Sequence, residues 1–185
     1  MSKLAGKERT RTSWSGSARR WRSVKMPRFE DLDHEGFMRE ALVEAEKALI
    51  RGDRPIGAVI VHDGQVVARG SNTFRTDHSH IAHAELNALR AGADYLWEYQ
   101  NGCTIYTTVE PCVMCLGAIV NANIRNIVFG LPDNHIRTCD VIPAVEYIRK
   151  RVHNYVGGML DDECLAVYRR FSEDEARLVL TGSRR

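Results

Sequence analysis

The sequence has no long hydrophobic run, because nowhere in its 185 positions do eighteen or more apolar residues follow one another. A helix that spans a bilayer needs about 20 predominantly apolar residues, so we expect neither a membrane span nor a membrane partner. The chain also has no internal repeat. Its 44% of hydrophobic residues is ordinary for a globular protein, and its length suits one domain with a substantial core.

Cysteine is scarce, with five residues in the whole chain. An odd count without a recognisable signal peptide argues against a framework of disulfide bonds. We therefore expect a reducing compartment, the cytoplasm. Cysteines outside a functional cluster are expected to be small buried core residues.

Net charge is also low, at +2, but it is distributed unevenly. Residues 1–26 hold eight basic residues and one acidic residue, so this segment carries +7 and the rest of the chain carries −5. We expect residues 1–28 to form a basic, flexible tail and residues 29–185 to form one folded domain. Nucleic-acid affinity would have to come from the tail or from a local patch. The composition of the tail also fits a transit peptide, a segment bypassed by translation from Met26, or an RNA-binding arm that stacks Trp14 and Trp21.

Hydrophobic periodicity predicts strands that alternate with helices after an opening hairpin. The predicted strands are 56–61, 65–70, 103–109, 126–130 and 155–159. The predicted helices are 34–51, 83–90, 111 to about 121, 141–151 and 161 to about 180, with Gly52 ending the first and Pro111 in the first position of the third. This alternation is typical of an α/β fold with a mixed sheet covered on both faces.

Two fragments carry the chemistry: His83-Ala84-Glu85 and Pro111-Cys112-Val113-Met114-Cys115. They supply one imidazole, two thiols and one carboxylate. Three ligands leave the fourth corner of a tetrahedral zinc site open, as in catalytic zinc sites, whereas structural zinc usually has four protein ligands. The open corner would hold water activated to hydroxide, and Glu85 is close enough in sequence to exchange protons with it. Taken alone, the Cys-x-x-Cys fragment also fits a redox pair or half of a structural zinc knuckle.

The order and spacing of these fragments resemble the zinc-dependent deaminases of the cytidine deaminase superfamily. The resemblance spans roughly residues 37–171. Ile56-Gly57-Ala58-Val59, Gly70-Ser71-Asn72 and residues 109–115 are most similar to the branch of tRNA adenosine, guanine and fungal cytosine deaminases. The resemblance implies a three-layer α/β/α sandwich around a mixed sheet of about five strands, and Zn²⁺ held by His83, Cys112 and Cys115.

The same resemblance implies roles for the residues around the metal. Glu85 would be the catalytic proton shuttle. The substrate would be contacted by Asn72, by the backbone near Ala84 and Glu110, by Asp133 and by Phe171. Asn72 could instead serve as a turn residue, and Phe171 could instead be part of the core. A homodimer is also implied, with loops of one subunit completing the pocket of the other.

The sequence departs from the tRNA adenosine deaminases in two loops. After the fourth strand, their basic, glycine-rich loop is replaced by residues 131–139, in which Asp133 alone matches. Before the histidine, Ser79-His80-Ile81-Ala82 stands where Asp-Pro-Thr-Ala is usual. The leading hypothesis is therefore a deaminase of a free nucleobase, nucleoside or related heterocycle. The alternatives are a tRNA wobble-adenosine deaminase and, in another class, a non-catalytic zinc-binding subunit of a heteromeric deaminase.

Overall fold

The computed structural model describes residues 27–99 and 101–183. Residues 1–26, which make up nearly all of the predicted tail, lie outside this part, so the tail and its boundary at residue 29 stay predictions. The described chain begins with a short 3-10 helix, η2 (Phe29–Asp31). None of the helices in these two segments is both long and apolar enough to cross a membrane.

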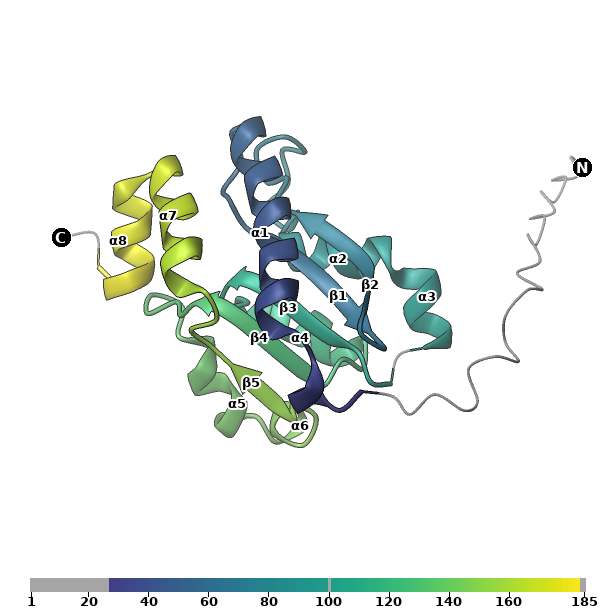
Figure 1. Cartoon of the computed structure of the whole chain (residues 1–185). Coiled ribbons are helices and arrows are strands. Elements are labelled where there is room, and N and C mark those ends of the chain that lie inside the picture. Colours follow the sequence, from purple (N-terminus) through teal and green to yellow (C-terminus); the bar gives the residue numbers. More distant parts are fainter. Residues whose placement is uncertain (1–26, 100, 184–185) are drawn as a thin grey trace, which may run out of the picture.

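A five-stranded mixed sheet forms the centre of the domain (Figure 1). Its strands are β1 (Gly57–His62), β2 (Gln65–Ser71), β3 (Thr104–Val109), β4 (Asn126–Leu131) and β5 (Asn154–Val156), in the order β2-β1-β3-β4-β5. β1 is antiparallel to both β2 and β3, whereas β3, β4 and β5 are parallel. β1 and β3 are almost entirely buried, as expected for strands covered on both faces.

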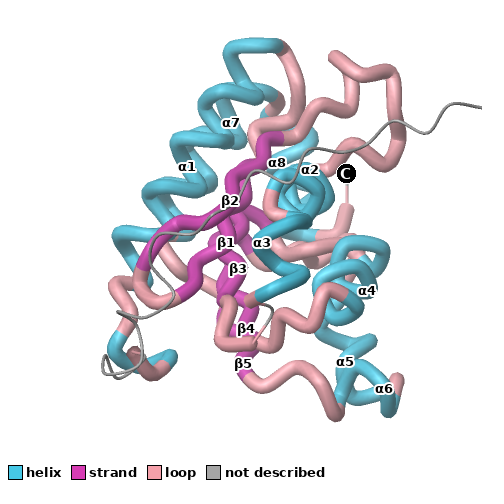
Figure 2. The backbone as a smooth tube through the Cα atoms, turned by 90° about the vertical axis from the view of Figure 1, so that its right-hand side faces the viewer, coloured by secondary structure: helices cyan, strands magenta, loops and turns pink. Residues whose placement is uncertain are grey.

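Helices cover both faces of the sheet (Figure 2), which confirms the predicted three-layer sandwich. One face packs against α1 (His34–Arg51), α7 (Asp161–Phe171) and α8 (Glu173–Thr181). The other packs against α2 (Ala84–Ala91), α3 (Ala93–Glu98), α4 (Val113–Asn121) and the short helices α5 (Val141–Ala144) and α6 (Glu146–Arg149). Each interface is a separate hydrophobic cluster, so the sheet lies between two cores.

Local sequence signals explain where several elements begin and end. Asp33 accepts a hydrogen bond from the N–H of Gly36 and caps α1, and Gly52 ends that helix in the left-handed conformation at φ 82°. Gly70 on β2 allows α2 to approach closely, because a Cβ there would lie 2.3 Å from the carbonyl oxygen of Ala84. This close contact fixes how near the first turn of α2 lies to the sheet.

Three predictions about helices were wrong, and one helix was missed. The helix expected from Pro111 begins two residues later, because Cys112 has an extended backbone and is the N-cap of α4. The single helix expected at 141–151 is two short helices, since the backbone at Val145 is extended. The single helix expected at 161–180 is broken at Ser172, whose side chain caps α8. Helix α3 was not predicted at all.

Among the cysteines outside the zinc-ligand group, Cys103 and Cys164 are buried as expected, but Cys139 is exposed.

Candidate zinc centre and active site

The zinc-ligand candidates lie where two helices begin. His83 is the N-cap of α2 and Cys112 is the N-cap of α4, and these two helices pack against each other. Cys112 follows the carboxyl end of β3, the edge at which α/β proteins commonly bind ligands. Helix N-termini favour thiolates, because their free N–H groups and dipole stabilise negative charge.

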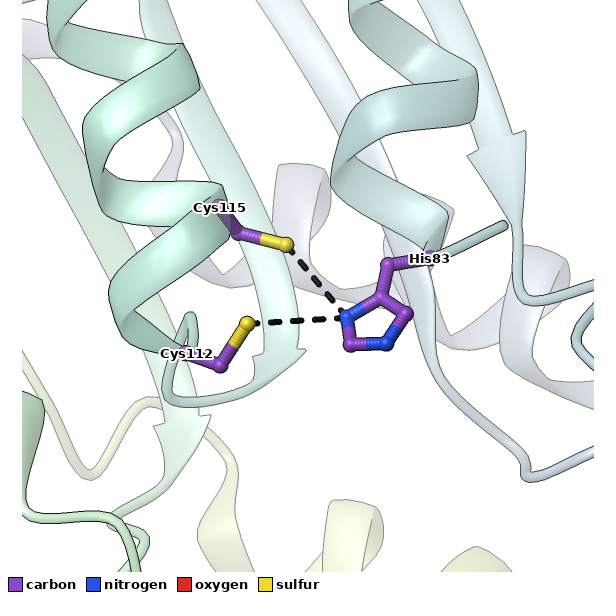
Figure 3. Close-up of side chains that lie close together, drawn as sticks. All are labelled: His83, Cys112 and Cys115. Atoms are coloured by element: carbon purple, nitrogen blue, oxygen red, sulfur yellow. Dashed lines mark hydrogen bonds between the residues drawn. The ribbon is translucent and has the colours of Figure 1, made fainter. Parts of the chain in front are cut away.

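The three donor atoms have the spacing of a metal site (Figure 3). Nδ1 of His83 lies 3.6 Å from Sγ of Cys112 and 3.5 Å from Sγ of Cys115, and all three atoms lie within 4.8 Å of one another. Zn–S bonds of about 2.3 Å and Zn–N bonds of about 2.0–2.1 Å place the ligands of tetrahedral zinc roughly 3.6 Å apart. The donor set and its spacing therefore fit Zn²⁺, and one coordination position is left without a protein ligand.

Of the two thiols, only that of Cys112 is poised to lose its proton. The hydrogen bond from the thiol of Cys115 lowers the pKa of Cys112 to about 4, and His83 adds a second hydrogen bond in the same direction. The hydrogen bond to Cys112, together with burial, raises the pKa of the Cys115 thiol. Because metal ligands must be deprotonated, Cys112 can act as the first thiolate ligand and Cys115 loses its proton on metal binding.

Glu85 lies in the first turn of α2 and is almost fully buried, with 3% of its surface exposed. Burial raises the pKa of its carboxyl to about 6. Its Oε2 accepts a hydrogen bond from Sγ of Cys115 at 3.5 Å. A carboxylate in this position can exchange protons near neutral pH beside the metal ligands.

The carboxylate of Glu110, two residues before Cys112, is fully engaged within the protein. It accepts hydrogen bonds from the backbone N–H groups of Asp133 and Cys139 at 2.9 Å and from the hydroxyl of Tyr155 at 2.8 Å. Its own backbone N–H donates to the carbonyl oxygen of Leu131. Glu110 thus ties the ligand segment to the loop after β4, a role that sequence spacing did not reveal.

Two more of the predicted substrate contacts also have internal partners. Oδ1 of Asp133 accepts hydrogen bonds from the N–H groups of His135 and Ile136, so Asp133 shapes the loop after β4. The ring of Phe171, at the end of α7, lies against the guanidinium of Arg75, whose Cζ is 4.8 Å from the ring centroid. Among the described residues, neither the side chain of Asp133 nor that of Phe171 has a contact with the zinc-ligand group.

Asn72 is buried next to the segment that leads to His83. Its Oδ1 accepts a hydrogen bond from the N–H of Phe74, which is the turn geometry weighed as the alternative to substrate contact. The adjacent Thr73 donates its N–H to the carbonyl oxygen of Ala82, one residue before His83. The oxygen of Asn72 is therefore used locally, while its amide group has no hydrogen-bond partner among the described residues.

Three arginines surround this loop, and we call them the arginine rim: Arg51, Arg54 and Arg75. Two of them contact the fully buried carboxylate of Asp53: the side chain of Arg51 lies 3.4 Å from it, and the backbone N–H of Arg75 donates to it at 2.7 Å. Thr76 Oγ1 donates to the same carboxylate at 2.6 Å. No spacing rule pointed to Asp53 or Arg54 in the sequence. Their only signal was a pair of charges between Gly52 and the apolar run that starts at Pro55.

Arg54 is the member of the arginine rim whose charge reaches the zinc-ligand group. The pKa of His83 is raised, mainly by its hydrogen bond to Cys112, and the charge of Arg54 acts in the opposite direction. On its other side, Arg54 pairs with Glu175 of α8 through an Nε–Oε2 distance of 2.8 Å.

Comparison with known proteins agrees with this geometry. The family described as the cytidine and deoxycytidylate deaminase zinc-binding region matches residues 32–131. A tRNA-specific adenosine deaminase from Bacillus subtilis (strain 168) is 36% identical over 131 residues, which cover 69% of this chain and 81% of that protein. A chloroplastic tRNA(adenine(34)) deaminase from Arabidopsis thaliana is 46% identical over 99 residues, but the match spans 52% of this chain and 8% of that protein.

Solved structures show the same fold. A structure from a study of A-to-I editing by tRNA:A34 deaminases at the wobble position of transfer RNA is 34% identical, with a TM-score of 0.65, and the match covers 71% of this chain and 98% of that one. A guanine deaminase from Nitrosomonas europaea shares the fold at 23% identity, with a TM-score of 0.61 and coverage of 74% of this chain and 83% of that one. Together with the matched region and the His83, Cys112 and Cys115 group, these similarities show that the chain belongs to the cytidine and deoxycytidylate deaminase family of zinc-dependent hydrolytic deaminases.

Proposed function

We propose that this protein is a tRNA adenosine deaminase, which converts adenosine to inosine in the anticodon loop by hydrolysis. The observation that carries the proposal is the 36% identity to the tRNA-specific adenosine deaminase of B. subtilis over 131 residues. The alternative considered from the sequence is thereby favoured over a free nucleobase or nucleoside as substrate. Both departures from the tRNA enzymes lie in loops, whereas the segments that carry the metal ligands retain the pattern of the family.

The chemistry follows from the residues around the metal. Bound Zn²⁺ supplies a Lewis acid that lowers the pKa of water towards neutrality. Glu85 accepts a proton from the attacking water and delivers it to the ring nitrogen next to the carbon that bears the amine. It then passes the second proton to the departing amine, which leaves as ammonia. Burial keeps the pKa of Glu85 near 6, so one carboxyl can serve first as a base and then as an acid.

Backbone groups near the metal offer contacts for the edge of the base. The first N–H groups of a helix have no partner within the helix, and Ala84 and Glu85 begin α2. The carbonyl group of Glu110 and the amide group of Asn72 lie in the adjoining segments. We assign recognition of the base to these groups, while the carboxylate of Glu110 and the side chain of Asp133 shape the surrounding loop.

A homodimer is part of this proposal. Val113 and Met114, on the first turn of α4 beside the metal ligands, are 47% and 38% exposed. Large apolar side chains at that position are suited to burial against a second copy of the chain. Sedimentation analysis of the wild type and of Met114→Glu tests this, since a monomeric wild type would contradict it.

The test of the function is ammonia release from zinc-loaded protein. The substrates are an anticodon stem-loop with adenosine at the wobble position, free adenosine, and a panel of free bases and nucleosides, with Glu85→Gln as the blank. Conversion of the stem-loop adenosine to inosine supports the proposal. Turnover of a free base or nucleoside alone would return the function to the leading sequence hypothesis. A stem-loop that is bound but not converted would favour a non-catalytic subunit.

A further inference from the structure

We propose that Arg54 binds a backbone phosphate of the RNA substrate next to the target nucleotide, and that Glu175 occupies this guanidinium when no RNA is bound. The inference rests on the proposed function, because it requires a polynucleotide substrate. It makes Arg54 a specificity-determining residue, which distinguishes RNA from a free base at the mouth of the site.

The position of Arg54 is the first reason. Its guanidinium Cζ lies 5.6 Å from the ring centroid of Phe74, whose N–H donates to Asn72. Arg54 therefore lies between the loop that leads to His83 and the first turn of α8, and 39% of its side chain is exposed.

The partner of Arg54 is the second reason. Two nitrogen atoms of the guanidinium contact both carboxylate oxygens of Glu175, with Nε–Oε2 at 2.8 Å and Nη2–Oε1 at 3.2 Å. A guanidinium binds a phosphate in the same two-point geometry as a carboxylate. A phosphate can thus replace Glu175 without any change in the position of Arg54. Glu175 lies in the first turn of α8, is partly exposed, and can turn its side chain towards solvent.

The rest of the arginine rim is committed to other groups. Arg51 donates to the carbonyl oxygen of Asn72 at 2.8 Å and to Asp53. Arg75 donates to the carbonyl oxygen of Gly52 and lies against Phe171. In the arginine rim, Arg54 alone is paired with a carboxylate of the C-terminal helices, so an incoming anion can take over its charge most easily.

The helix that carries Glu175 is attached to the other side of the site. The N–H of Asn134 donates to the carbonyl oxygen of Val179, and its side-chain amide donates to the carbonyl oxygen of Leu180. α8 is thus fixed at its C-terminal end by the loop after β4 and at its N-terminal end by Arg54. Figure 1 shows α7 and α8 side by side at this end of the sheet. Exchange of Glu175 for phosphate would leave the hydrogen bonds from Asn134 and the buried side chains of Ala176 and Val179 in place.

The experiment compares Arg54→Gln and Glu175→Gln in the full-length, zinc-loaded protein. Binding of the inosine-containing product stem-loop, which is not turned over, is measured across a series of salt concentrations, together with kcat and KM on the adenosine stem-loop. For Arg54→Gln we expect about tenfold weaker binding and a salt dependence that is shallower by about 0.7, the value for one single-strand phosphate. For Glu175→Gln we expect tighter binding by a few-fold, because the competing carboxylate is gone. In both variants the change in KM should follow the change in binding, and it should exceed any change in kcat.

The opposite signs separate substrate binding from a merely structural ion pair. If both variants weaken binding to the same degree, or if Arg54→Gln keeps the salt dependence of the wild type, the inference is wrong. Arg54→Lys retains the charge, so it should keep the salt dependence while losing affinity, even if Arg54→Gln folds poorly. Arg39→Gln removes an equal charge from an exposed pair with Glu163 and is the matched control. A wild type that deaminates adenosine but neither binds nor converts the stem-loop would overturn the proposed function itself.

Discussion

Oε2 of Glu85 lies 3.5 Å from Sγ of Cys115, so the buried carboxylate lies against the metal-ligand group without belonging to it. Glu85→Gln should therefore keep the metal and lose the reaction. We expect the variant to hold about one zinc ion per chain. We expect kcat to fall by at least about 10²–10⁴-fold, the usual contribution of general acid–base catalysis. Metal analysis and ammonia release on the same preparation measure the two properties separately. Loss of zinc together with activity would place Glu85 among the ligands instead.

Cys115→Ser is expected to do the reverse and remove the metal. Cys115 is fully buried between His83 and Glu85, and a hydroxyl is a poor substitute for a thiolate as a zinc ligand. Zinc content and activity should fall together, as they should when a chelator strips the wild type. Cys139→Ser is the matched control, because that thiol is exposed and lies outside the metal-ligand group. Zinc retained at wild-type content in Cys115→Ser would refute the assignment.

The ligand group could be predicted from sequence because its members occupy fixed places in two short fragments. His83 is the N-cap of α2 and Glu85 is the second residue of that helix, so their spacing in the sequence fixes how they lie in the structure. The network around them could not be predicted in this way. Tyr155 reaches Glu110 across 45 positions, and Arg54 reaches Glu175 across 121, and no local pattern encodes such pairs.

The fold could be predicted for a similar reason, with failures where local signals compete. Apolar runs and alternation predicted all five strands, although the one expected at 155–159 is Asn154–Val156. The pattern is strongest for β1 and β3, which are buried on both faces. The prediction of a single C-terminal helix was wrong because the amphipathic pattern continues across Ser172. There the extended backbone and the hydrogen bond from Glu175 N to Ser172 Oγ begin a new helix. A serine can lie inside a helix as well as at its start, so its role depends on tertiary packing.

Asp53 should stabilise the loop that leads to His83, and its loss should be costly. Arg75 N and Thr76 N both donate to Oδ1, and Thr76 Oγ1 donates to Oδ2, so each of these neighbours is a donor. Asp53→Asn would place an NH₂ group against one of these donors. We expect the free energy of unfolding to fall by about 1–3 kcal/mol at pH 7, measured by urea denaturation. Asp77→Asn, on the same loop but exposed, should change it far less.

The same carboxylate predicts a dependence of stability on pH. Desolvation opposes ionisation of Asp53, but hydrogen bonds from Thr76 and Arg75 outweigh it and lower the pKa below its usual value. A lowered pKa stabilises the fold above the unfolded value of about 3.9, and this contribution is lost as the pH falls through the folded value. The stability difference between wild type and Asp53→Asn should thus be full at neutral pH and shrink below about pH 4. A difference that stays constant down to about pH 3 would contradict this assignment.

Tyr155→Phe tests whether Glu110 joins the ligand segment to β5 and the loop after β4. The variant removes one donor from a buried carboxylate and leaves two backbone N–H groups in place. Hydrogen bonds to charged groups contribute about 1.5–3 kcal/mol, and we expect a loss of that size in urea denaturation with zinc content unchanged. Tyr147→Phe removes an exposed hydrogen bond to Asn121 and should cost little. Equal effects of the two variants would show that Glu110 does not depend on Tyr155.

The basic N-terminal segment leads to a prediction that depends on charge alone. Residues 1–26 carry +7 while the rest of the chain carries −5, so long-range attraction to RNA has to come mainly from this segment. Replacing its arginines and lysines with glutamine should weaken binding of a stem-loop and make it less sensitive to salt, since fewer counterions are released. Activity on a single nucleoside, where it can be measured, should be unchanged, because the zinc centre is untouched. Glutamine replacement of as many exposed basic residues on the folded domain, away from the arginine rim, is the control for net charge. If that control lowers RNA affinity as much as the N-terminal replacement, the segment has no specific part in binding, and the arginine rim would have to provide the main phosphate contacts.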